Sequence, residues 1–276
     1  MKVQLVSREY EVHGIHVSQT GPDREAHSNP MVLVHGGLHG AWCWERYVPY
    51  FAARGWQCHA LTWRGRGQSA RLPEREAVRR PIEDVADDIE AVAASLSAPP
   101  VIVAHSMGAL ASLKFAERNP HAGLVLLTPA LPAEVSPTPV DLAVDPDSMW
   151  GPPPFDTTRE LFFSGAEAED ARRYYGLLVP ESAKAVTQAC ADSRVSIDPV
   201  RISGPGLVMA AEFDMLSPPA EVRRLAGLLG MDYRYARGFG HGVMLDKNAE
   251  SVAQTVQTWL TVHVSSAAGE GVAVAP

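Results

Sequence analysis

The stretch Val101-Ile102-Val103-Ala104-His105-Ser106-Met107-Gly108 places a serine directly between a short apolar run and a helical pattern. The apolar run predicts a strand that is buried on both faces, and the residues after Ser106 predict a helix. A sharp turn from strand to helix strains the backbone and requires small residues two positions before and after the serine, here Ala104 and Gly108. Such a turn holds the serine hydroxyl above the sheet edge, with the positive end of the helix beneath it. Ser106 is therefore the candidate nucleophile, and a buried structural serine is the alternative.

Short apolar segments alternate with helical patterns along most of the chain. Residues 3–19 carry β-forming side chains interrupted at His13-Gly14, which predicts an opening hairpin. Further strands are expected at residues 31–34, 58–63, 101–104, 124–127, 206–211 and 232–236. Helices are expected at residues 41–53, 81–96, 107–118, 218–229 and 248–264. This alternation predicts an α/β fold with a doubly wound, mostly parallel central sheet.

Residues 131–200 interrupt the alternation, because they are rich in proline up to residue 154 and then show three helical stretches. A connection of about 70 residues between two strands far exceeds the roughly 2–6 residues that such connections usually take. We therefore expect a helical cap over the carboxyl edge of the sheet, where ligands of α/β proteins bind. The predicted organisation is a core (1–130 and 201–264), a helical cap (131–200) and a flexible tail (265–276).

Composition and charge exclude several classes of protein. The 276 residues are 46% hydrophobic and 20% charged, with a formal net charge of −8, so neither nucleic acid nor an anionic membrane is an expected partner. No apolar run approaches the roughly 18 residues of a membrane span, and the N-terminus becomes charged before a signal-peptide core could form.

The three cysteines, Cys43, Cys58 and Cys190, are odd in number and widely spaced, which argues against disulfides and thiolate zinc sites. We expect a cytoplasmic protein whose cysteines are small buried hydrophobes.

A serine nucleophile needs a base to take its proton and a third group to orient that base. Asp214 follows the strand expected at residues 206–211, and His241 follows the next expected strand, within the glycine-rich stretch 238–242. The carboxyl ends of parallel strands meet at one sheet edge, so Ser106, Asp214 and His241 are expected to form a catalytic triad there. An aspartate after a strand can also form a turn, and a loop histidine can be an exposed polar residue. Other acids that could complete the triad lie in or beside the expected cap: Glu134, Asp192 and Asp198.

A glycine-rich turn, His35-Gly36-Gly37-Leu38, follows the first central strand. Such a turn can point a backbone N–H at negative charge developing on a substrate oxygen, and the N–H of Met107 can supply a second donor. Losing one donor of this kind typically costs on the order of a hundred- to a thousandfold in rate. His35 and His39 lie four residues apart, but no third ligand is near them in the sequence, so neither a metal nor another cofactor is expected.

These motifs together resemble the α/β-hydrolase fold superfamily, from the opening hairpin to the final helix. Residues 104–108 are similar to its G-x-S-x-G nucleophile elbow, with Ala104 in place of the first glycine. Residues 35–44, HGGLHGAWCW, resemble the HGxxHGxWxW segment of the plant methylesterase and hydroxynitrile lyase group, and residues 64–69, RGRGQS, resemble the superfamily's RGxGxS loop. The resemblance implies the same triad, with the backbone N–H groups of Gly37 and Met107 as the oxyanion hole.

A fold of this kind carries many reactions, so the reaction has to be inferred from the site. Epoxide hydrolases and haloalkane dehalogenases of this fold use aspartate at the elbow, where this chain has serine. Hydroxynitrile lyases carry a lysine next to the catalytic histidine, where this chain has Gly242. We expect a serine hydrolase that cleaves an ester, thioester or lactone through an acyl-enzyme. The alternatives are a non-hydrolytic enzyme with the same three residues (a lyase, an elimination catalyst or a cofactor-free oxygenase) and a ligand-binding module with an inactive triad.

Aromatic side chains in the expected cap predict a small apolar or aromatic substrate. The residues predicted to bind it are Leu38, Trp150, Phe155 and Phe162. For any one of these aromatics the alternative is that it only attaches the cap to the core. Arginines at positions 64, 66, 71, 75, 79 and 80 predict a solvated face, with contact to an anionic substrate as the alternative.

Overall fold

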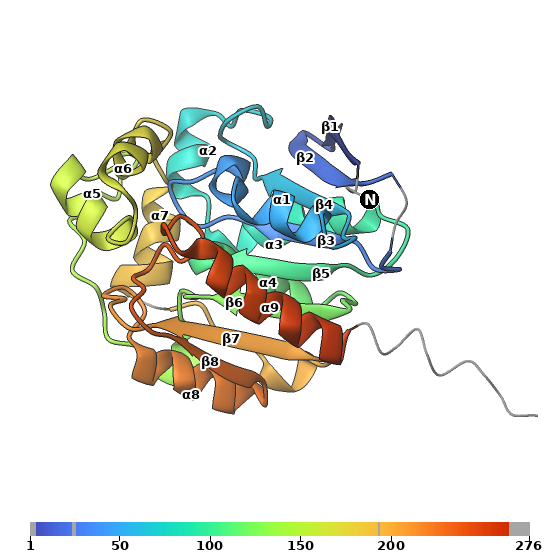
Figure 1. The fold of residues 1–276 in the computed structure, drawn as a ribbon. Helices are drawn as coiled ribbons and strands as arrows, with labels where there is room; N and C mark the ends of the chain where they lie inside the picture. The colour runs from blue at the N-terminus through green and yellow to red at the C-terminus, as the bar shows by residue number, and fades with distance from the viewer. Residues whose placement is uncertain (1–3, 24–25, 193, 265–276) are drawn as a thin grey trace, which may run out of the picture.

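The sheet that the sequence predicts runs through the centre of the molecule (Figure 1). The computed structural model describes residues 4–23, 26–192 and 194–264, and the predicted tail lies outside them. Eight strands pair in the order β1-β2-β4-β3-β5-β6-β7-β8. The β1–β2 and β2–β4 pairs are antiparallel, and every pair from β4 to β8 is parallel. The prediction of an α/β fold with a mostly parallel sheet is confirmed.

Strand burial follows the apolar runs of the sequence. The strands are β1 (Leu5–Val12), β2 (Ile15–Pro22), β3 (Met31–Val34), β4 (Cys58–Thr62), β5 (Val101–His105), β6 (Gly123–Leu127), β7 (Gly206–Ala211) and β8 (Asp232–Ala236). Every residue of the five strands β3, β4, β5, β6 and β7 is buried, because helices cover both faces of the sheet. The edge strands β1 and β8 carry exposed residues, and their sequences are accordingly more polar.

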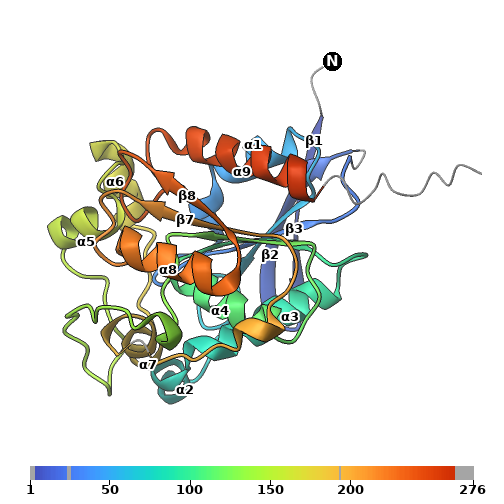
Figure 2. The ribbon, with the colours of Figure 1, turned by 90° about the horizontal axis from the view of Figure 1, so that it is seen from below.

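The helices divide between the two faces of the sheet (Figure 2). They are α1 (Tyr47–Ala52), α2 (Glu74–Arg79), α3 (Val85–Ala94), α4 (Ser106–Ala116), α5 (Phe155–Phe162), α6 (Ala168–Tyr175), α7 (Ala183–Val186), α8 (Pro219–Leu229) and α9 (Ala249–His263). Side chains of α1 and α9 pack on one face of the sheet, and those of α3, α4 and α8 pack on the other. Among the described helices, none has both the length and the apolar character that crossing a membrane requires.

The structure differs from the helical predictions in two ways. The helices expected at residues 41–53 and 81–96 each begin as a 3₁₀ turn, Ala41–Trp44 and Ile82–Asp84, and continue as α1 from Tyr47 and as α3 from Val85. The helix α2 was not predicted at all. It is six residues long and buries only Val78, so it leaves no apolar periodicity in the sequence.

The segment from residue 131 to 200 connects β6 to β7 and contains α5, α6 and α7, followed by a π-helical turn, Thr187–Ala191. Figures 1 and 2 show α5 and α6 together beyond one end of the sheet, and Figure 2 shows α7 apart from them, next to α2. Ion pairs join the segment to the rest of the chain: Arg46 lies 2.7 Å from Asp170, and Glu45 lies 2.5 Å from Arg173. Phe163 and Tyr174 also share one apolar cluster with α1 and α9, so the segment is packed on the core.

Candidate active site

Ser106 is the first residue of α4 and follows β5 without an intervening loop. Its φ angle of 52° lies in the left-handed region, which side-chain-bearing residues rarely occupy outside functional sites. The turn lies tightly against the chain that leaves β3. A Cβ atom on Gly108 would lie 2.0 Å from the carbonyl oxygen of His35, and one on Gly36 would lie 3.0 Å from Cβ of Ser106. Glycine at position 108 therefore has a direct steric reason.

The structure brings Ser106, Asp214 and His241 together at the carboxyl edge of the sheet. Nε2 of His241 lies 2.9 Å from Oγ of Ser106, and Nδ1 of His241 lies 3.0 Å from both carboxylate oxygens of Asp214. An ionised carboxylate can only accept hydrogen bonds, so Nδ1 carries the proton in neutral His241 and Nε2 presents its lone pair to the serine hydroxyl. This is the tautomer that a general base needs.

Hydrogen bonds hold the acid, Asp214, and the base, His241, in place. Oδ1 of Asp214 accepts the N–H groups of Leu216 at 2.9 Å and Ser217 at 3.0 Å. The carbonyl oxygen of His241 accepts the Thr128 hydroxyl at 2.8 Å and Nε2–H of His105 at 3.1 Å. Both loops are therefore held in place by several hydrogen bonds before any substrate binds. Glu134, a rival acid, instead accepts the backbone N–H of Ile197.

A cavity opens directly in front of the serine. It is lined by Gly37, Leu38, His39, His105, Ser106, Met107, Leu142, Trp150, Phe162, Glu181, Val186, Cys190, Leu216 and His241. Three of the four residues predicted to bind substrate, Leu38, Trp150 and Phe162, belong to this lining. Phe155 does not line the cavity. Its ring packs edge-on against Tyr175 at 5.4 Å, between the first two helices of the 131–200 segment.

Gly37 and Met107, the predicted oxyanion donors, both line the cavity beside Ser106. The N–H of Met107 belongs to the first turn of α4, where helix amides have no acceptor within the helix. The next amide of the glycine turn is already engaged, because the N–H of Leu38 donates to Oε2 of Glu181 at 3.1 Å. Leu38 also has a positive φ of 64°, so the turn is held in a strained conformation.

Three further histidines lie around the glycine turn and are uncharged at neutral pH. Burial lowers the pKa of His39 to about 4 and the pKa of both His35 and His105 well below the ordinary value. Nδ1–H of His35 donates to the carbonyl oxygen of Gly36 at 2.7 Å, and Nδ1–H of His39 donates to that of Gly37 at 2.6 Å. These side chains thus hold the glycine turn. Over the described ranges, no three potential ligands gather in a way that could hold a metal ion.

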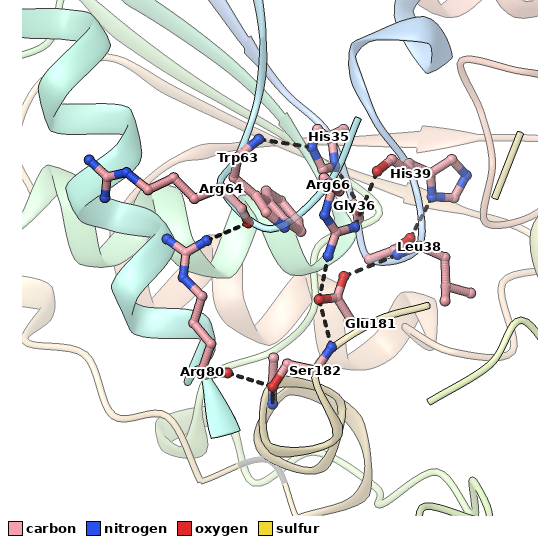
Figure 3. Close-up of polar contacts among 12 residues, drawn as sticks. His35, Gly36, Leu38, His39, Trp63, Arg64, Arg66, Arg80, Glu181 and Ser182 are labelled. Carbon is pink, nitrogen blue, oxygen red and sulfur yellow. Dashed lines mark hydrogen bonds and ion pairs between the residues drawn. The ribbon is translucent and has the colours of Figure 1, made fainter. Parts of the chain in front are cut away.

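The expectation of a solvated arginine face is wrong for Arg66. This side chain is buried and lies 2.5 Å from Oε1 of Glu181, and Figure 3 shows the pair beside the turn that contains Leu38. Sequence reasoning missed Glu181, because nothing around it distinguishes it from a surface acid of a helical segment. It also missed several apolar lining residues: Leu142, Val186, Cys190 and Leu216.

Residues 31–263 match the sequence profile of the alpha/beta hydrolase family, and the chain therefore belongs to that family. The chain is 37% identical over 107 residues to esterase PIR7B of Oryza sativa subsp. japonica, across 37% of this chain and 38% of the rice protein. It is 30% identical over 109 residues to the pyrethroid hydrolase of Sphingobium wenxiniae, across 37% of this chain and 36% of that protein.

These curated relatives are matched over less than two fifths of their own length. A solved esterase structure from Thermogutta terrifontis is similar over 94% of this chain and 99% of that chain, with a TM-score of 0.66 and 20% sequence identity. At that identity the likeness concerns the fold alone.

Proposed function

We propose that this protein is a serine hydrolase that cleaves a carboxylic ester, thioester or lactone through an acyl-enzyme. One observation carries the proposal. The lone pair of His241 Nε2 faces the Ser106 hydroxyl at 2.9 Å, with Asp214 behind the imidazole, and Ser106 and His241 both line the cavity. The esterase name of the rice relative agrees with this chemistry.

The reaction follows from the proton positions. Ser106 Oγ attacks the substrate carbonyl while its proton passes to Nε2 of His241, and Asp214 stabilises the imidazolium that forms. The N–H groups of Gly37 and Met107 bind the oxyanion of the tetrahedral intermediate. The proton on Nε2 then moves to the leaving group, and a water molecule releases the acid from Ser106 by the same steps.

The cavity lining favours a small substrate with an apolar or aromatic acyl part. Trp150 and Phe162 lie on the same cavity as Ser106, together with aliphatic side chains such as Leu38 and Leu142. Glu181 is the one carboxylate in the lining, and Arg66 neutralises it. An uncharged apolar group therefore fits this lining better than a sugar or a peptide.

Position 242 favours hydrolysis over cyanohydrin cleavage. A Cβ atom on Gly242 would lie 2.1 Å from the backbone carbonyl oxygen of Phe162, so no side chain fits beside His241 at this point of the chain. The lysine that the hydroxynitrile lyases carry there has no space in this protein.

The test is turnover of a panel of chromogenic esters with short to long acyl chains. Wild type is compared with Ser106→Ala and with a matched control, Ser112→Ala, which removes another buried hydroxyl of α4 that bonds only the Gly108 carbonyl. The proposal requires turnover by wild type and by the control, and its loss in Ser106→Ala. Turnover that survives in Ser106→Ala would contradict the proposal that Ser106 forms an acyl-enzyme. A folded wild type that cleaves no ester would favour a non-hydrolytic reaction.

A further inference from the structure

Glu181 lies far from Ser106 in the sequence and comes from the segment that covers the sheet edge, yet its carboxylate is buried at the active-site cavity. Oε1 accepts a hydrogen bond from Arg66 at 2.5 Å and from the N–H of Ser182 at 2.9 Å. Oε2 accepts the N–H of Leu38 at 3.1 Å. Figure 3 shows the carboxylate between the guanidinium of Arg66 and the turn that contains Leu38.

The contact to Leu38 fixes a particular peptide unit. The amide between Gly37 and Leu38 is held at one end by Glu181, through its N–H, and at the other end by Nδ1–H of His39, through its carbonyl oxygen. The preceding amide, which carries the N–H of Gly37, is held through its carbonyl oxygen, which accepts Nδ1–H of His35 at 2.7 Å and the backbone N–H of His39 at 3.4 Å. The two amides meet at the Cα atom of Gly37, and glycine leaves both torsions at that atom free, so the hydrogen bonds on either side of it are what fix the direction of the Gly37 N–H.

The same segment holds the next atoms of the turn. The carbonyl oxygen of Leu38 accepts the N–H of Val179 at 3.0 Å, and the carbonyl oxygen of His39 accepts Nη1–H of Arg66 at 3.2 Å. The backbone of Glu181 is in turn fixed by two hydrogen bonds with Trp150, at 2.8 and 2.9 Å. The turn with the positive φ at Leu38 is therefore held by residues of the 131–200 segment and by Arg66, which the Glu181 carboxylate orients.

We propose that Glu181 is a positioning residue, which holds the Gly37–Leu38 peptide so that the N–H of Gly37 points at the oxyanion. The segment 131–200 then completes the oxyanion hole in addition to shaping the pocket. The inference rests on the proposed function, because an oxyanion hole serves acyl transfer. Glu181 itself does not touch the reacting atoms.

The first test is Glu181→Gln, which keeps the volume of the side chain. Arg66 and the N–H of Ser182 fix the amide oxygen at the Oε1 position, so the amide NH₂ faces the N–H of Leu38 and repels it. We expect kcat for a reactive ester to fall by roughly ten- to a hundredfold, with KM within about twofold of wild type, since the loss falls on the transition state. The matched control is Asp170→Asn, which weakens another ion pair between the segment and the core, 2.7 Å from Arg46, without contact to the turn. This control should keep the wild-type kcat.

The second measurement is the rate at which a fluorophosphonate labels Ser106. Phosphonylation also places negative charge in the oxyanion hole, so the labelling rate of Glu181→Gln should fall in parallel with kcat. A wild type that labels at Ser106 but cleaves no ester would refute the proposed hydrolase, while the labelling rate of Glu181→Gln would still decide the role of Glu181. Unchanged kcat and unchanged labelling in a folded Glu181→Gln protein would overturn the inference.

A second variant covers the case in which Glu181→Gln does not fold because Arg66 is left buried without a partner. The double variant Arg66→Met/Glu181→Leu removes both charges, a change that buried ion pairs often tolerate. It still leaves the N–H of Leu38 without its acceptor, so the same fall in kcat and labelling rate is expected. Wild-type rates in this variant would overturn the inference, and so would loss of the fold in both variants, which would assign Glu181 to stability alone.

Discussion

The substitution Gly108→Ala adds one methyl group where the elbow helix meets the chain that leaves β3. Its Cβ would lie 2.0 Å from the His35 carbonyl oxygen and 2.9 Å from that of Val34. Contact without strain requires these atoms to separate by about 1 Å or more, and both neighbours are backbone atoms that cannot rotate away. Either α4 or the glycine turn must move, which separates the N–H of Met107 from that of Gly37. A misplacement of about 1 Å costs roughly a hundredfold in rate, and overpacking costs about 1–3 kcal/mol of stability.

The assay is kcat/KM on the best ester of the panel together with Tm from thermal unfolding. We expect kcat/KM to fall about a hundredfold and Tm to fall by about 3–10 °C. The matched control is Gly227→Ala in α8, where an added Cβ meets nothing within 4 Å. The control should keep full activity and gain about 0.5–1 kcal/mol, because alanine is the better helix former. Wild-type activity and stability in Gly108→Ala would refute the steric account of the elbow.

Three further predictions concern the acid of the triad, the buried histidines and the cavity cysteine. Asp214→Asn should lower kcat by roughly 10³–10⁴, because an amide no longer fixes the tautomer of His241, and a loss below tenfold would contradict the assigned role. Lowering the pH from 7 to 5 should cost about 2 kcal/mol of unfolding free energy through His39 alone, whose pKa is about 4 in the folded state against 6.5 unfolded. That contribution is complete above pH 6.5 and is lost as the pH falls toward 4. His39→Gln should therefore flatten the dependence of the unfolding free energy on pH, measured by denaturant titration, and an unchanged dependence would contradict the contribution assigned to His39. Burial raises the pKa of Cys190 to about 12, so iodoacetamide near pH 8 should leave this thiol unmodified in the native protein and alkylate it after unfolding, as read by mass spectrometry. Alkylation in the native state would contradict the raised pKa of Cys190.

The central strands were predictable because their burial on both faces leaves uninterrupted apolar runs, as in Val101–His105. The approach of Ser106, Asp214 and His241 followed from the rule that parallel strands end at one edge, which needs no knowledge of side-chain packing. The helix Glu74–Arg79 escaped prediction because it makes too few apolar contacts to leave a pattern.

The residues that support the turn were harder to predict. Arg66 belongs to a run of arginines that suits a solvated surface, and its burial depends on Glu181, 115 positions further along the chain. Phe155 and Phe162 begin and end one helix and are equally aromatic, yet only Phe162 reaches the cavity. Such distinctions are set by how the 131–200 segment packs on the sheet, and no local sequence pattern encodes that arrangement.

The most direct test of the central claim is the covalent state of Ser106 during turnover. Wild-type protein is mixed with an activated ester, quenched in acid within the first turnover and mapped by peptide mass spectrometry. The account predicts the mass of the acyl group on the peptide that contains Ser106, formed in a burst that Ser106→Ala lacks. Release of the product acid with no acyl group on Ser106 at any time point would contradict it.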